Sequence, residues 1–139
     1  MTSSRILLPC VALVALTAIV WVRLYVDRIG EMRSRRIRAQ ALATSREAQT
    51  LQRVNAADNF RNLFEVPVLF YALCIALAAT GMATTFFVVG AWAYVLLRAV
   101  HSFIHITYNR VMHRFTVYVL STVLLFVMWC AFAVHLGGQ

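Results

Sequence analysis

The second long apolar segment of the chain begins with a group of polar side chains. Asp58, Asn62 and Glu65 are spaced by four and three residues, so a helix would place them on one face. Arg61 stands beside them, and Pro67 should bend the helix nearby. Placing an ionisable group inside a membrane costs about 2.5–3.5 kcal/mol, so such a group marks a function or a structural ion pair. The alternative is a polar turn at the membrane surface, with Arg61 reaching toward water.

A second group lies near the end of the third apolar segment. Arg98, His101 and His105 follow one helical face, and Arg98 stands about 12 Å of helix before the segment ends. We interpret Glu65 as the only buried acid, so we expect a Glu65–Arg98 ion pair within or between subunits, which could be purely structural. Histidines four residues apart can bind a metal or haem. No third ligand has a matching spacing, so we expect no metal site.

A third group starts the fourth apolar segment. Arg110, Arg114 and Tyr118 follow one another at intervals of four residues, with His113 alongside. Arg114 and Tyr118 therefore share a helical face that can look into a bundle. Basic and aromatic residues are also ordinary at a membrane interface, and the spacing alone fits both interpretations.

The apolar composition indicates an integral membrane protein. Hydrophobic residues make up 62% of the 139 residues, whereas soluble domains have about 45–50% apolar residues. A bilayer span needs roughly 20 mostly apolar residues. Four stretches qualify, at about 6–26, 63–80, 84–106 and 115–136. We expect residues 1–139 to form a single all-α domain of four transmembrane helices.

The connections between these stretches are short except for the first, at about 27–60. Residues 39–59 contain no proline or glycine, so we expect the second helix to begin there, before it enters the lipid. Gly81 should end that helix in a tight turn, and Tyr108-Asn109 should separate the third helix from the fourth. Such connections predict an up-down-up-down bundle.

Charge predicts the orientation of the bundle. The net charge is +8, and eight arginines fall between Arg28 and Arg61 in the first connection. The third connection carries Arg110 and Arg114, whereas the second connection carries no charge. The positive-inside rule therefore predicts a cytoplasmic first connection and a cytoplasmic site. The rule explains the basic balance, so we expect no nucleic-acid partner, and anionic membrane lipids are the natural partners.

The three cysteines stand inside apolar stretches. Cys10, Cys74 and Cys130 are far apart in sequence, which favours small core residues over a disulfide set or a metal site.

With these motifs in this order, the chain resembles the MAPEG family, membrane-associated proteins in eicosanoid and glutathione metabolism. Within that family it resembles a bacterial branch. The resemblance covers nearly the whole chain in length, number of spans and placement of polar groups. It rests on Val22-Arg23-Leu24, Arg61-Asn62-Leu63-Phe64-Glu65, Arg98-x-x-His101 and Arg110-x-x-x-Arg114-x-x-x-Tyr118.

The resemblance implies a homotrimer that binds glutathione as a cosubstrate between neighbouring subunits. It assigns the binding to Arg23, Arg61, Asn62, Glu65, His101, Arg114 and Tyr118. Arg114 would be the catalytic residue nearest the sulfur. Arginines pair with carboxylates, and a carboxylate can take the ammonium group of glutathione. A nearby arginine also favours the thiolate form of a thiol, which could attack an electrophile dissolved in the lipid.

Three classes of function follow from these residues. The first is a glutathione-dependent transferase or peroxidase acting on lipophilic small molecules. The second is a non-catalytic membrane protein of the same fold that binds a lipid or a thiol. The third is a proton-coupled transporter, since a carboxylate in the membrane suits proton exchange. Because the arginines cluster at one side, the sequence argues against a path across the membrane.

Overall fold

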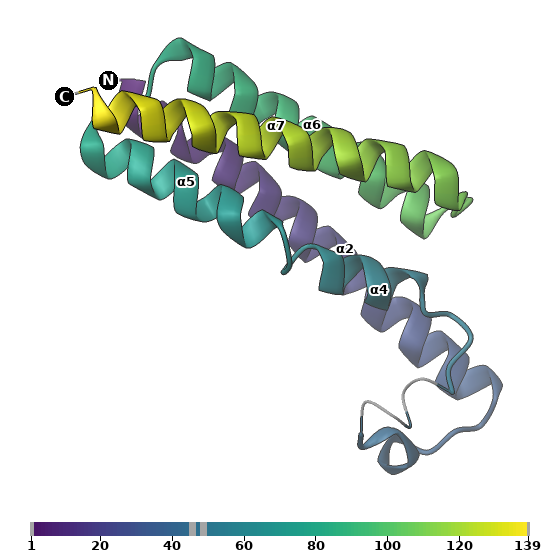
Figure 1. Cartoon of the computed structure of the whole chain (residues 1–139). Coiled ribbons are helices and arrows are strands. Elements are labelled where there is room, and N and C mark those ends of the chain that lie inside the picture. Colours follow the sequence, from purple (N-terminus) through teal and green to yellow (C-terminus); the bar gives the residue numbers. More distant parts are fainter. Residues whose placement is uncertain (1, 45–46, 48–49, 139) are drawn as a thin grey trace.

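The computed structural model describes residues 2–44, 47 and 50–138, which form an elongated helical bundle (Figure 1). Its long helices are α2 (Leu7–Ser34), α4 (Asn55–Asn62), α5 (Pro67–Thr80), α6 (Thr85–Ile106) and α7 (Val111–Gly137). Two short elements, α1 (Thr2–Arg5) and η1 (Ala39–Leu42), stand before and after α2. Counting α4 and α5 as one element, the described residues hold four helices long and apolar enough to cross a membrane. The predicted all-α membrane fold is confirmed.

The helices alternate in direction along the bundle. Figure 1 shows the start of α2, the turn between α5 and α6 and the end of α7 at one end, and the first connection at the opposite end. Gly81 ends α5 with a φ of 70°, a left-handed conformation that glycine adopts without strain. Asn109 makes the turn between α6 and α7 with a φ of 45°. Both predicted chain breaks are therefore confirmed.

The second membrane-length helix is interrupted at residues 63–66. Proline has no backbone N–H, and its ring would collide with the carbonyl of Leu63 if the helix continued through it. Pro67 accordingly stands in the first turn of a new helix, α5. The backbone crosses the break in tight turns, with the Phe64 N–H donating to the Arg61 carbonyl at 2.9 Å. The expected bend at Pro67 is thus a full break, and α4 begins at Asn55, outside the apolar stretch as predicted.

Helix α2 continues past its apolar stretch and holds the first connection through a carboxylate. Glu31 is only 3% exposed. Its two oxygens accept the backbone N–H groups of Gln52 and Arg53, both at 2.8 Å, and one of them accepts Arg35 Nη1 at 2.7 Å. The expectation that Glu65 is the only buried acid is therefore wrong. Glu31 is buried because backbone N–H groups distant in sequence fold back onto it and replace the water that a carboxylate requires.

The apolar interior packs closely at mid-bundle. Phe70 of α5 stacks on Tyr94 of α6, with ring centroids 4.5 Å apart. A side chain at Gly90 would place its Cβ 3.0 Å from Met128 Sδ, so the absence of a side chain at Gly90 lets α6 and α7 pack closely there. Apolar side chains that are exposed on α2, α5, α6 and α7, such as Leu96 and Val134, are available to contact lipid tails.

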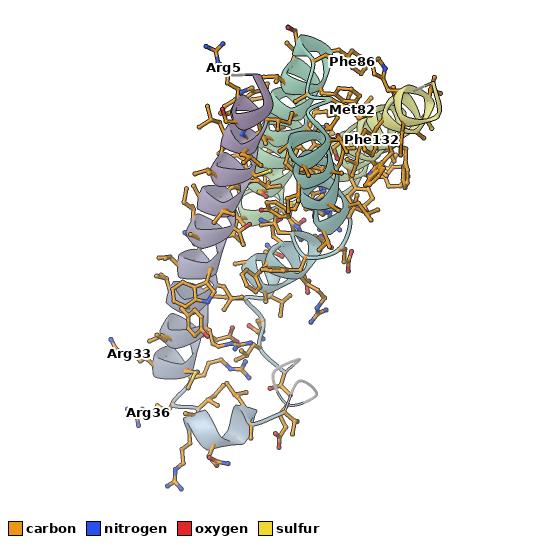
Figure 2. The ribbon with its side chains drawn as sticks, turned by 90° about the vertical axis from the view of Figure 1, so that its left-hand side faces the viewer. Arg5, Arg33, Arg36, Met82, Phe86 and Phe132 are labelled. Atoms are coloured by element: carbon orange, nitrogen blue, oxygen red, sulfur yellow. The ribbon has the colours of Figure 1, made fainter. Side chains whose placement is uncertain are left out.

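The two ends of the bundle differ in character. Figure 2 shows Arg33 and Arg36 at the end that carries the first connection, and Met82 and Phe132 at the opposite end. The polar residues considered next lie toward the arginine-rich end, where α4, α6 and α7 end or begin.

Candidate functional site

Two adjoining cavities lie among α4, α6 and α7. The first has a volume of about 190 Å³ and is lined by Asn62, His101, Val111, Arg114, Phe115 and Tyr118. The second has a volume of about 270 Å³ and is lined by Asp58, Arg61, Asn62, Glu65, His105 and Arg114. Asn62 and Arg114 line both cavities, so the two spaces share a wall. Six of the seven residues expected to bind a ligand are therefore together in one chain.

The guanidinium of Arg114 is held by an asparagine of the preceding turn. Arg114 Nη1 donates to Asn109 Oδ1 at 2.8 Å. Asn109 Nδ2 in turn donates to Asn55 Oδ1 at 3.0 Å, at the start of α4. Arg114 is partly buried, whereas Arg110 is exposed. The predicted common face of Arg114 and Tyr118 is confirmed, because both line the first cavity.

His101 contributes an acceptor to the first cavity. Its Nδ1 lies 3.2 Å from the backbone carbonyl of Arg114. A carbonyl only accepts hydrogen bonds, so Nδ1 carries the proton and Nε2 of the neutral ring is an acceptor. This tautomer is inferred from the hydrogen bond. Nε2 is buried and has no hydrogen-bond partner among the described residues, so it can accept a hydrogen bond from a donor that reaches it.

Arg98 is fully buried, as predicted. Its Nη2 donates to the Asn62 carbonyl at 3.2 Å, in the last turn before the chain break at residues 63–66. Its guanidinium also lies 5.6 Å from the centre of the Tyr118 ring, within the range of a cation–π contact. Arg98 thus supports two residues of the first cavity from behind, without lining it.

Glu65 does not pair with Arg98 in a single chain. The break before Pro67 turns Glu65 outward, and its side chain is exposed. The ion pairs among the described residues are Arg23–Asp27, Arg35–Glu31 and Arg61–Asp58. One chain alone therefore neither buries Glu65 nor places it against Arg98. The ion pair expected within or between subunits, and the electrostatic coupling of the two charges, stay predictions.

Arg23 lies apart from the other six expected residues. It lines a third cavity of about 300 Å³, together with Asp27, Gln52, Arg53, Asn55 and Ile106. Its Nε donates to Asp27 Oδ2 at 3.1 Å. This cavity shares no lining residue with the two cavities that Arg114 lines.

Three asparagines near the cavities, Asn55, Asn59 and Asn109, are not among the seven residues expected to bind the ligand. Asn59 is fully buried and accepts a hydrogen bond from Ser102 Oγ at 3.2 Å. Asn55 and Asn109 connect α4 to the turn that positions Arg114. One signal in the sequence could have identified Asn109. Asparagine tolerates a left-handed backbone, and Asn109 lies in the short turn between two helices, directly before Arg110.

The arrangement suits a ligand that carries both negative and positive groups. Arg61 and Arg114 offer two cations on the walls of the second cavity, and Asp58 and Glu65 offer two carboxylates, of which Asp58 lies 3.9 Å from Arg61. Val111 and Phe115 give the first cavity an apolar rim, and both side chains are exposed on the outer surface of the bundle. A lipid-soluble molecule can therefore approach the first cavity from the membrane.

Comparison with known proteins gives one match. A family model described as the MAPEG family matches residues 6–134. No curated protein and no solved structure matches the chain.

Proposed function

The chain belongs to the MAPEG family, and from this premise we propose that it is a multi-pass membrane enzyme that uses glutathione to attack lipophilic electrophiles. The observation that carries the proposal is the shared wall of the two cavities. Asn62 and Arg114 stand between a polar cavity with Arg61 and Glu65 and a second cavity with an apolar rim. A charged thiol and an apolar substrate can meet there.

Charge and size both support glutathione as the polar ligand. The tripeptide carries two carboxylates and one ammonium group, which can pair with the cations of Arg61 and Arg114 and with the carboxylate of Glu65, once Arg61 exchanges its 3.9 Å contact with Asp58 for the ligand. Drug-sized ligands occupy cavities of about 300–1,000 Å³. The cavities, at about 190 and 270 Å³, each fall below that range. A ligand of this size would need both cavities, with Asn62 and Arg114 against its middle.

Arg114 is proposed as the catalytic residue that favours the thiolate. A free thiol has a pKa of about 8.5 and is mostly protonated at neutral pH, and a nearby cation lowers that pKa. His101 lines the same cavity and offers Nε2 as a hydrogen-bond acceptor, and the proton of the thiol would pass to solvent. The residues Arg61, Asn62, Glu65, His101, Arg114 and Tyr118 would hold glutathione, and Tyr118 would stand beside its sulfur.

The thiolate can then react in two ways. In a conjugation, a sulfur–carbon bond forms as the bond to the leaving group breaks, and the leaving group departs with the electron pair. In a peroxide reduction, the sulfur bonds to one peroxide oxygen, the O–O bond breaks, and an alcohol leaves after protonation. A second glutathione then displaces the hydroxyl from the oxidised sulfur, giving a disulfide and water. Val111 and Phe115 would admit the apolar partner in both cases.

The proposal extends to assembly and orientation. Arg23 lines a separate cavity from Arg114 in its own chain, which suits a ligand site completed between neighbouring subunits of a homotrimer. The arginine-rich end, including Arg33 and Arg36, is proposed to face the cytoplasm from a bacterial inner membrane (Figure 2).

The test is the thiolate absorbance of glutathione in the ultraviolet, measured with purified protein at neutral pH. We expect wild-type protein to generate this absorbance on binding, and Arg114→Ala to lose it together with conjugating activity. Arg110→Ala is the matched control, because Arg110 is exposed one turn away, and it should retain both. Glutathione binding with full thiolate formation in Arg114→Ala would reject the catalytic assignment. Binding without any thiolate in the wild type would favour the non-catalytic alternative.

A further inference from the structure

One asparagine joins three helices beside the proposed catalytic arginine. The backbone N–H of Asn109 donates to the Ile104 carbonyl of α6 at 2.8 Å. Its side-chain oxygen accepts from Arg114 of α7 at 2.8 Å, and its side-chain nitrogen donates to Asn55 of α4 at 3.0 Å. Both ends of the amide are therefore used, and a flipped amide would set its NH₂ group against the donors of Arg114.

The backbone conformation explains why asparagine can do this. Asn109 has a φ of 45°, in the left-handed region that most side chains avoid. Asparagine, aspartate and glycine tolerate this region better than other residues. Of these, only asparagine offers an acceptor to Arg114 and a donor to Asn55 at the same time.

Free arginine side chains lose roughly 1.5–2 kcal/mol of rotamer entropy when they are fixed. A guanidinium that already has a short hydrogen bond to the protein has lost part of this freedom before a ligand arrives. Among the described residues, Asn109 is the side chain that makes such a bond to Arg114. It also links that bond to α4, which carries Arg61 and Asn62 of the same site.

We infer that Asn109 is the positioning residue of the site, which directs the Arg114 guanidinium toward the bound thiol and connects its direction to α4. This inference rests on the proposed function. It adds a residue that would touch neither glutathione nor the electrophile and would act only through Arg114.

Two substitutions at this position test the side chain. Asn109→Gly keeps the left-handed turn and removes both side-chain hydrogen bonds, so a residue that only supports the turn would tolerate it. Asn109→Asp keeps the shape and the turn, but it places a negative charge against Arg114 and removes the donor to Asn55, so its effect combines lost positioning with added charge. Tyr108→Phe is the control, because Tyr108 is exposed in the same turn and contacts His113.

The first readout is the pH at which bound glutathione is half thiolate, followed by ultraviolet absorbance at saturating glutathione. We expect Asn109→Gly to raise this midpoint by about one pH unit, which is tenfold less thiolate at a pH well below the midpoint. Asn109→Asp should raise it at least as much, because its carboxylate offsets the charge of Arg114. Tyr108→Phe should match the wild type. A wild-type midpoint in Asn109→Gly would overturn the inference. If that variant fails to fold, Asn55→Ala decides, because it removes the hydrogen bond from Asn109 to α4 and adds no charge, and a wild-type midpoint in it would overturn the inference.

The second readout needs no glutathione. Phenylglyoxal modifies arginine, and mass spectrometry of the peptide containing Arg114 gives its rate of modification in detergent. We expect faster modification of Arg114 in Asn109→Gly than in the wild type, and equal rates would overturn the inference. If the wild type gives no thiolate, the proposed function fails, and this comparison still decides whether Asn109 positions Arg114.

Discussion

Replacing Arg98 by methionine should change the stability of the protein little, although Arg98 is a fully buried cation. Its hydrogen bond to the Asn62 carbonyl, at 3.2 Å, is worth about 1.5–3 kcal/mol as a charged hydrogen bond. Its contact with the Tyr118 ring, at 5.6 Å, contributes about 2 kcal/mol in a desolvated place. Against these gains, Nε and Nη1 of Arg98 are buried without a partner in the described part of the chain, and each unpaired donor costs about 1–3 kcal/mol.

The summed gains and the summed costs of Arg98 overlap. Losing both at once should therefore change the free energy of unfolding little. Methionine is long, flexible and apolar, and it fills most of the space that the arginine stem occupies. We expect Arg98→Met to remain within about 1.5 kcal/mol of the wild type. Arg98→Ala also leaves a void, and large-to-small changes in a core cost about 2–5 kcal/mol. The alanine variant should therefore be clearly less stable than the methionine variant.

The assay is unfolding of the purified protein in mixed micelles, by titration with a denaturing detergent and measurement of helix content. Arg110→Met is the control for loss of an exposed arginine. The reasoning would be refuted if Arg98→Met cost about 3–5 kcal/mol and Glu65→Gln relieved that cost. Such a result is the signature of a direct buried ion pair, which would then have to form between subunits. If the double variant loses only slightly less stability than the sum of the two single variants, the coupling is weak. That result agrees with two charges that do not touch.

Three further predictions concern assembly, orientation and packing. Native mass spectrometry in detergent should detect a trimer, and a stable monomer or dimer would contradict the shared site. A cysteine introduced at Thr44, in protein lacking the native cysteines, should be protected from impermeant maleimide in intact cells, and ready labelling would place the first connection outside. Gly90→Leu should destabilise the bundle by about 1–3 kcal/mol through overpacking against Met128, and unchanged unfolding would contradict the close approach of α6 and α7.

The fold can be predicted closely because its signals are local. A helix in lipid satisfies its own backbone hydrogen bonds, so four long apolar stretches specify four spanning helices without knowledge of their neighbours. Gly81 and Asn109 mark the turns, because few residues accept the left-handed backbone that each turn requires. The position of Pro67 is informative too, but residue type alone predicts only a bend, whereas the chain breaks completely at residues 63–66.

The site can be predicted in part. Helical spacing places Arg114 beside Tyr118 and Asp58 beside Asn62, since residues four apart on one helix share a face whatever the rest of the chain does. Contacts between different helices are harder to predict from the sequence. Glu65 is the charge of opposite sign within a span, which predicts a pair with Arg98, yet the structure gives Arg98 a backbone carbonyl instead. A free carbonyl next to a chain break leaves no trace in residue type.

The amino-acid sequence by itself determined the number of spans, their alternating direction, the basic end of the bundle and the helical faces that carry polar groups. The tertiary structure alone decided which of those faces meet. It separated Arg23 from Arg114, buried Glu31 under the first connection, exposed Glu65, and brought Asn109 against both Asn55 and Arg114. The physical reason is that periodicity defines a side chain's direction only relative to its own helix. The rotation and packing of each helix against its neighbours determine the partner that the side chain reaches.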